Sequence, residues 1–204
     1  MIFKTSKKII IIIFLLSMIS IAYAQNDKSN RIEVLVNENV ITKYDIIQRL
    51  KINSILRRVE INDNNYNQLV KSVIDDLVVE KLKNHKINEY NIAYEQEEFD
   101  QYEKRYYSNN NYKKEELEEL FLINNINYNY LREYIETELK WQKLIYGLYL
   151  RITSITKQEI SDLMSKNPDM SEEAANDLIL QKQLDIKSKK LIKDLRDEAT
   201  IEYK

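Results

Sequence analysis

Between residues 126 and 152 the apolar side chains recur at intervals of three and four positions. This spacing places them on one stripe of an α-helix, with charged residues such as Glu133 and Lys140 on the other side. Asn127 or Asn129 can cap its first turn. A helix of roughly 24 residues is about 36 Å long, and it needs other helices to cover its apolar stripe. The stretch is therefore predicted to be the central helix of the fold.

The same helical period occurs in six further segments. Two of them begin with a pattern typical of a capping box, Thr42 with Asp45 and Thr156 with Glu159, in which each side chain bonds the other residue's backbone N–H. The predicted helices cover residues 42–56, 68–86, 94–107, 115–123, 156–166 and 171–195.

Two short segments are β-prone instead. Residues 32–36 are followed by a turn at 37–39 and a possible return strand at 40–41. Residues 200–203 alternate but have no turn-linked neighbour, so their natural partner is 32–36. We therefore expect a mostly α fold, a multi-helix orthogonal core with a small sheet formed by the N-terminal hairpin and the C-terminal strand.

The N-terminus has the layout of a secretory signal peptide. Basic residues between Lys4 and Lys8 precede an apolar run at 9–21, and small residues stand before a cut between Ala24 and Gln25. An uncleaved membrane anchor is the alternative, but the run is shorter than the ~20 residues that a spanning helix needs. We expect residues 1–24 to be removed, residues 25–204 to form a single domain, and the protein to reach the periplasm through the general export pathway. Its contact with the membrane would then be transient.

Composition excludes several classes of function. The chain has 31 basic and 33 acidic residues, and removal of the leader makes its net charge more negative. The charges are interleaved, so nucleic acid is not expected as a partner. One glycine and one proline leave no material for a phosphate loop or a dinucleotide fingerprint. The absence of cysteine excludes thiol catalysis and fits an exported protein with a core large enough to fold without disulfides.

Because asparagine and tyrosine are enriched together with isoleucine and lysine, as in AT-rich genomes, we give no functional weight to an asparagine by itself.

Candidates for catalysis and metal binding are weak. The single histidine, His85, lies near a predicted helix end beside Lys83 and Lys86, where a solvated capping role is favoured over catalysis. The densest acidic group would fan around a helix and form a solvated face rather than a metal site; it consists of Glu115, Glu116, Glu118 and Glu119. We expect no enzyme activity, no cofactor and no metal.

The aromatic residues are the one set with a functional character. Tyrosine and tryptophan provide large amphipathic contact areas at low entropic cost, which suits a surface that binds unfolded chains. For any one of them, core packing combined with codon bias is the alternative. The candidate peptide-binding residues are Tyr102, Tyr106, Tyr130, Trp141 and Tyr149, with Tyr107 beside them.

Several segments resemble, in order, the SurA family of periplasmic chaperones. The stretch IEVLVNENVITKYD at 32–45 resembles the family's opening strand, turn and helix, and VKSVIDDLVVEKL at 70–82 is similar to its next helix. The family's fifth helix and the segment after it are similar to INYNYLREYIETELKWQKL and LRITSITKQEISDLM. Its closing helix and strand are similar to SEEAANDLILQKQ and LRDEATIEYK. The resemblance covers nearly all of the chain after the leader.

One departure from the family is large. Its members usually carry parvulin-type prolyl isomerase domains before the last helix, whereas here only residues 167–170 separate the last two predicted helices. The resemblance implies an ATP-independent chaperone core that binds unfolded outer-membrane-type polypeptides in an apolar and aromatic crevice, without isomerase activity. A second copy could close that crevice, as a homodimer. The alternatives are a structural or interaction protein with one dedicated partner and, third, an enzyme.

Overall fold

The computed structural model describes residues 30–204, so the predicted leader and its cleavage site lie outside the described residues. Strand β1 (Ile32–Val36) and strand β2 (Asn39–Thr42) form an antiparallel hairpin. The hairpin can turn in two residues because Asn37 has a left-handed backbone, with φ 52°, a conformation that asparagine adopts more easily than most residues.

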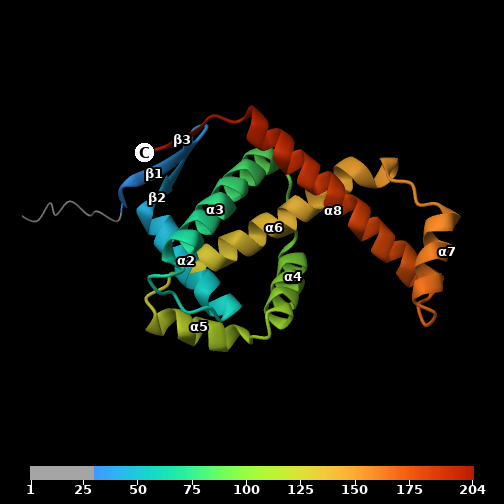
Figure 1. Ribbon diagram of the computed structural model, residues 1–204, viewed down its shortest axis with the longest axis horizontal. Helices are drawn as coiled ribbons and strands as arrows, with labels where there is room; N and C mark the ends of the chain where they lie inside the picture. The colour runs from blue at the N-terminus through green and yellow to red at the C-terminus, as the bar shows by residue number, and fades with distance from the viewer. Residues whose placement is uncertain (1–29) are drawn as a thin grey trace, which may run out of the picture.

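The C-terminal strand β3 (Ile201–Tyr203) completes this sheet. It pairs antiparallel with β1, Val36 opposite Ile201 and Val34 opposite Tyr203, and gives the order β2-β1-β3. The Asn37 amide also donates to the Thr200 carbonyl at 2.8 Å, and the Thr200 amide donates to the Asn37 side chain at 2.9 Å. The expected pairing of the two ends is confirmed, and Figure 1 shows it beside the label of the C-terminus.

Seven α-helices make up most of the remaining described chain. They are α2 (Lys43–Arg57), α3 (Tyr66–Glu89), α4 (Gln96–Asn109), α5 (Lys114–Ile123), α6 (Tyr128–Tyr149), α7 (Lys157–Lys166) and α8 (Glu172–Glu198), with a 3-10 turn, η2, at Leu150–Ile152. The predicted fold class, mostly α with a small three-stranded sheet, is confirmed. In this part of the chain no helix is both long and apolar enough to cross a lipid bilayer.

Local signals in the sequence set several helix starts. Both predicted capping boxes form: Thr42 and Asp45 exchange side-chain and backbone hydrogen bonds at the start of α2, and Thr156 and Glu159 do so at α7. Of the two candidate caps for the central helix, Asn127 takes the role, because its side chain accepts from the Asn129 amide at 3.0 Å.

Several predicted boundaries differ from the structure by two or three residues, as at the ends of α3, α4 and α8. Two of the differences have a clear local cause. The central helix α6 ends at Tyr149, not near residue 152, and Thr153 donates its hydroxyl to the Tyr149 carbonyl that the helix end leaves free. Helix α3 begins at Tyr66, two residues earlier than predicted, because the Asn62 carbonyl accepts from Tyr66 and turns the preceding segment directly into the helix.

Three apolar clusters lie between these elements. The first joins the sheet to α2 and α3, the second lies among α2, α4, α5 and α6, and the third joins α6 to α3 and α8. Helix α8 packs against α3 and α6 from about Leu180 onward, through residues such as Leu184, Ile192 and Leu195. Figure 1 shows α7 and the N-terminal half of α8 extending away from the other helices, on the side opposite the sheet.

Candidate functional site

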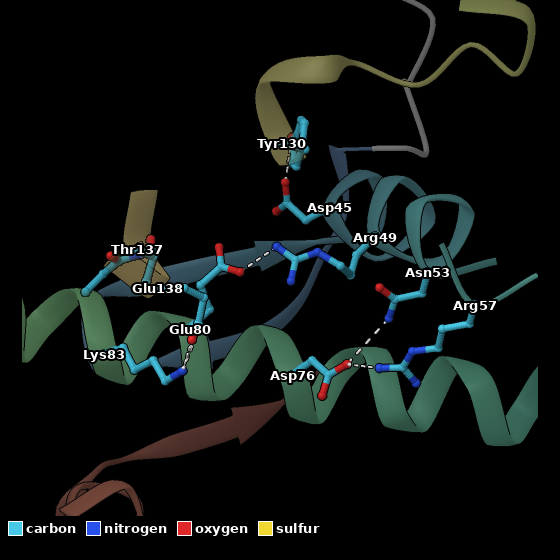
Figure 2. Close-up of polar contacts among 11 residues, drawn as sticks. Asp45, Arg49, Asn53, Arg57, Asp76, Glu80, Lys83, Tyr130, Thr137 and Glu138 are labelled. Atoms are coloured by element: carbon cyan, nitrogen blue, oxygen red, sulfur yellow. Dashed lines mark hydrogen bonds and ion pairs between the residues drawn. The ribbon is translucent and has the colours of Figure 1, made fainter. Parts of the chain in front are cut away.

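Helix α2 carries a polar side chain at every fourth position, namely Asp45, Arg49, Asn53 and Arg57. Since an α-helix has 3.6 residues per turn, this repeat runs along one face of the helix. Figure 2 shows that these four residues point toward α3 and α6, where their partners lie. We call this row the α2 polar ladder.

The middle of the ladder is buried. Arg49 is 4% exposed, forms an ion pair with Glu80 of α3, and places its guanidinium carbon 4.6 Å from the centre of the Tyr134 ring. A buried charge needs such partners, because removing it from water costs several kcal/mol. The aromatic ring and the carboxylate together hold this guanidinium between α3 and α6.

The two ends of the ladder are more open. At one end Asp45 accepts a hydrogen bond of 2.7 Å from the Tyr130 hydroxyl of α6. At the other, the side chains of Asn53 and Arg57 approach Asp76 at 3.5 and 3.9 Å; Arg57 is largely exposed and Asp76 partly exposed. The ladder is therefore buried at its middle and reaches solvent at the Arg57 end.

A second ion pair joins α3 to α6 further along. The Lys83 ammonium donates to both carboxylate oxygens of Glu138, at 2.7 and 2.9 Å, and lies 5.7 Å from the centre of the Trp141 ring. Next to it, Thr137 donates to the Asn84 side chain at 3.0 Å. Within residues 30–204, no buried side-chain nitrogen or oxygen lacks a hydrogen-bond partner. The polar interior is thus fully paired and rigidly placed.

Two clefts meet at the Lys83–Glu138 pair, since both residues line each of them. The polar cleft, about 360 Å³, lies among α2, α3, α4 and α6. Its charged residues are equal in number, three cations and three carboxylates: Arg49, Arg57, Lys83, Asp76, Glu80 and Glu138. The aromatic cleft, about 330 Å³, lies among α3, α4, α6 and α8 and includes Tyr102, Trp141 and Tyr146.

The structure brings three of the five predicted peptide-binding residues to these clefts. Tyr106 lines the polar cleft, and Tyr102 and Trp141 line the aromatic cleft. Tyr130 lies apart, hydrogen-bonded to Asp45 in a separate small pocket among α2, α3 and α6. Tyr149 lies at the end of α6, where the Lys187 ammonium is 5.6 Å from its ring centre. The predicted set therefore does not form one continuous surface.

The aromatic residues at the clefts are substantially packed. Trp141 is 4% exposed, and its indole N–H donates to the Ser188 hydroxyl of α8 at 2.9 Å. Burial raises the pKa of Tyr106 to about 12 and also raises the pKa of Tyr102, so both phenols stay neutral near pH 7. Tyr107 is buried and donates to Glu103 at 2.7 Å, away from both clefts.

A hollow larger than either cleft lies elsewhere, between α7 and α8. This arm groove, about 830 Å³, has an apolar floor that includes Leu163, Leu178, Ile179 and Ile186. Leu178 and Ile186 are 50% and 58% exposed. Its rim is charged and comprises Glu159, Asp162, Lys166, Lys182 and Asp185.

The weak candidates for catalysis and metal binding lie on the surface. His85 is half exposed, and its Nε2 lies 3.1 Å from Glu89 one turn further along α3. The four glutamates of α5, Glu115, Glu116, Glu118 and Glu119, are exposed. In the part of the chain that the structure describes, no three histidine, cysteine or acidic residues converge as metal ligands would.

Sequence reasoning missed the α2 polar ladder and the arm groove. The ladder had a readable signal, a polar residue at every fourth position of α2, although other polar residues of the helix, such as Gln48 and Lys51, partly mask it. The groove had none, because Leu178 and Ile186 read as core residues of a long helix. No protein-family model matches the chain, and no curated protein is significantly similar to it.

Proposed function

We propose that the protein is an exported, ATP-independent chaperone that binds unfolded polypeptides, outer-membrane-type proteins among them, and has no prolyl isomerase activity. The observation that carries this proposal is the pair of clefts, one polar and one aromatic, that meet at Lys83 and Glu138. The signal-peptide pattern and the resemblance of the sequence to the SurA family support export and a chaperone role.

The polar cleft suits a polypeptide backbone better than a charged ligand. Every residue of an unfolded chain presents one N–H donor and one C=O acceptor. Cations and carboxylates line the cleft in equal number, so it has no net charge that would favour an anion or a cation. Arg57 and Asp76, at its open end, are 3.9 Å apart, and the Asn53 amide is 3.5 Å from Asp76. Both contacts are long, so these residues can exchange them for backbone groups of a bound chain.

The aromatic cleft suits the side chains of the same polypeptide. Tyr102, Tyr146 and Ile145 line it together with the edge of Trp141, and aromatic side chains give favourable contacts to apolar and aromatic groups alike. An extended segment that crosses the Lys83–Glu138 pair would place its backbone in one cleft and side chains in the other. Binding of this kind has little sequence preference, as a chaperone needs.

The single tryptophan makes the proposal directly testable. Trp141 lines the aromatic cleft, so a tryptophan-free, unfolded β-barrel polypeptide should change its emission on binding. The protein should also suppress aggregation of that polypeptide at micromolar concentration. Tyr102→Ser should weaken both effects, whereas Tyr66→Ser, which changes a 45% exposed tyrosine at the start of α3, should weaken neither. Unchanged aggregation at micromolar protein would refute the proposal.

A structural or interaction protein with one dedicated partner is the second candidate, and the arm groove favours it because it is one defined apolar surface. Crosslinking followed by mass spectrometry separates the two: many weakly bound clients favour the chaperone, and one stoichiometric partner favours the alternative. Clear turnover in a prolyl isomerisation assay would contradict both.

A further inference from the structure

The arm groove exposes apolar surface in a symmetric pattern. Leu178 and Ile186, each at least half exposed, are eight residues apart on α8, and Lys182 stands midway between them. At 3.6 residues per turn, all three lie on one face of the helix. If a second α8 lies antiparallel on this face with its Lys182 opposite this one, Leu178 of each copy meets Ile186 of the other.

The charges along α8 follow the same antiparallel logic. Residues 172–177 carry three carboxylates and no cation, and residues 182–190 carry four lysines and one aspartate. Glu172 and Glu173 also suit the N-terminus of their own helix, but Asp177 lies beyond its first turn. In an antiparallel pair, the acidic stretch of each copy lies beside the basic stretch of the other.

We infer that a second copy of this chain occupies the arm groove, and that two α7–α8 hairpins associate about a two-fold axis near Lys182. The isologous contact would be a bundle of four helices, with apolar residues at its centre. Three carboxylates line the groove against two cations, Lys166 and Lys182, so its lining can offset the charge of two Lys182 ammonium groups brought close together; the carboxylates are those of Glu159, Asp162 and Asp185. This inference does not depend on the proposed chaperone activity.

The size of the surface sets the expected affinity. The first 16 residues of α8 are about 24 Å long, the ten residues of α7 are about 15 Å long, and each helix is about 10 Å wide, so the two-helix face covers on the order of 400 Å² per copy. A total of roughly 800 Å² is below the usual range of stable specific interfaces and is typical of weak, transient ones. The dimer should therefore be weak and depend on concentration in the micromolar range.

Sedimentation equilibrium of the full mature chain tests the interface. The wild type should shift from monomer to dimer across the micromolar range, and Leu178→Asp should weaken the dimer at least roughly tenfold. Leu122→Asp is the matched control, because Leu122 is 79% exposed on α5 and far from the arm in the fold. Far-UV circular dichroism should show both variants folded. A wild type that stays monomeric, or a dimer that Leu178→Asp leaves intact, would overturn the inference.

A charge exchange between two chains tests the antiparallel arrangement itself. Glu172 and Lys190 are both exposed and lie five turns apart on the same flank of α8, so each should lie near the other in the opposite copy. Glu172→Lys or Lys190→Glu alone should weaken the homodimer. Mixing the two variants should restore a dimer, because their heterodimer pairs opposite charges at both ends. An effect within one chain cannot be rescued by mixing, so failure of the mixture to dimerise would refute the antiparallel contact.

Discussion

Arg49→Met should lower the free energy of unfolding, because it leaves the Glu80 carboxylate without its ion-pair partner. The Arg49 and Glu80 side chains are 5% and 12% exposed, so their ion pair is essentially buried. Removing one partner of such a pair typically costs about 3–5 kcal/mol, since the remaining charge is desolvated and unpaired. The loss of the cation–π contact with Tyr134 adds up to about 2 kcal/mol. Against a typical stability of about 5–15 kcal/mol, this is a large fraction.

The double variant Arg49→Met with Glu80→Met distinguishes pairing from packing. Two apolar side chains leave no buried charge, so most of the loss from the single variant should be recovered, and the coupling energy should exceed roughly 2 kcal/mol. Urea unfolding followed by Trp141 fluorescence and circular dichroism measures each free energy of unfolding. Losses that simply add in the double variant would refute the assignment of a buried, coupled pair.

Arg57 supplies a control on the same ladder. It is 59% exposed and only 3.9 Å from Asp76, and exposed ion pairs contribute about 0–1 kcal/mol. Arg57→Met should therefore change the free energy of unfolding by less than about 1 kcal/mol. A loss as large as that for Arg49→Met would show that burial does not decide the effect.

Three further predictions concern pH, capping and the sheet. Burial raises the pKa of Tyr106 from 10.0 to about 12. The stability that the neutral phenol contributes is therefore complete below about pH 10 and is lost as the pH rises toward 12. Tyr106→Phe should flatten this part of a pH–stability profile, and an unchanged slope would contradict the assignment. Thr42→Ala should lower the free energy of unfolding by about 1 kcal/mol through loss of the α2 capping box, and urea titration measures it. Asn37→Ala should lower the free energy of unfolding by about 1–2 kcal/mol because alanine is strained in the left-handed conformation. Asn37→Gly relieves that strain and should lose only the hydrogen bond that the Asn37 side chain accepts from the Thr200 amide. Equal losses in the two variants would refute the role of backbone strain.

Several asparagines have a backbone role that the amino-acid composition alone did not indicate. Five non-glycine residues have positive φ among the described residues, and four of them are asparagines: Asn37, Asn91, Asn111 and Asn125. Asparagine tolerates the left-handed region better than most residues. The single glycine, Gly147, lies within α6 and serves no turn. In a chain with one glycine, asparagine thus takes over the positions where glycine usually ends a helix or closes a hairpin.

Local patterns by themselves determined most of the elements and the starts of several helices. Capping boxes at Thr42 and Thr156 act within one turn of helix, so the sequence alone predicts them. The pairing of the two chain ends followed from elimination, since residues 200–203 had no neighbour with which to form a hairpin. These features depend on interactions that span a few residues or on a choice between few partners.

Only the tertiary structure decided which of the predicted residues face a cleft. Tyr102, Tyr106 and Trp141 come together because α4, α6 and α8 pack around the Lys83–Glu138 pair. The spacing of residues along the sequence does not predict which helices pack against one another. The arm groove arises for the opposite reason: α8 is longer than the body that covers it, so a stripe that reads as core is left partly exposed. Periodicity predicts that a face is apolar, but only packing decides how much of that face is covered.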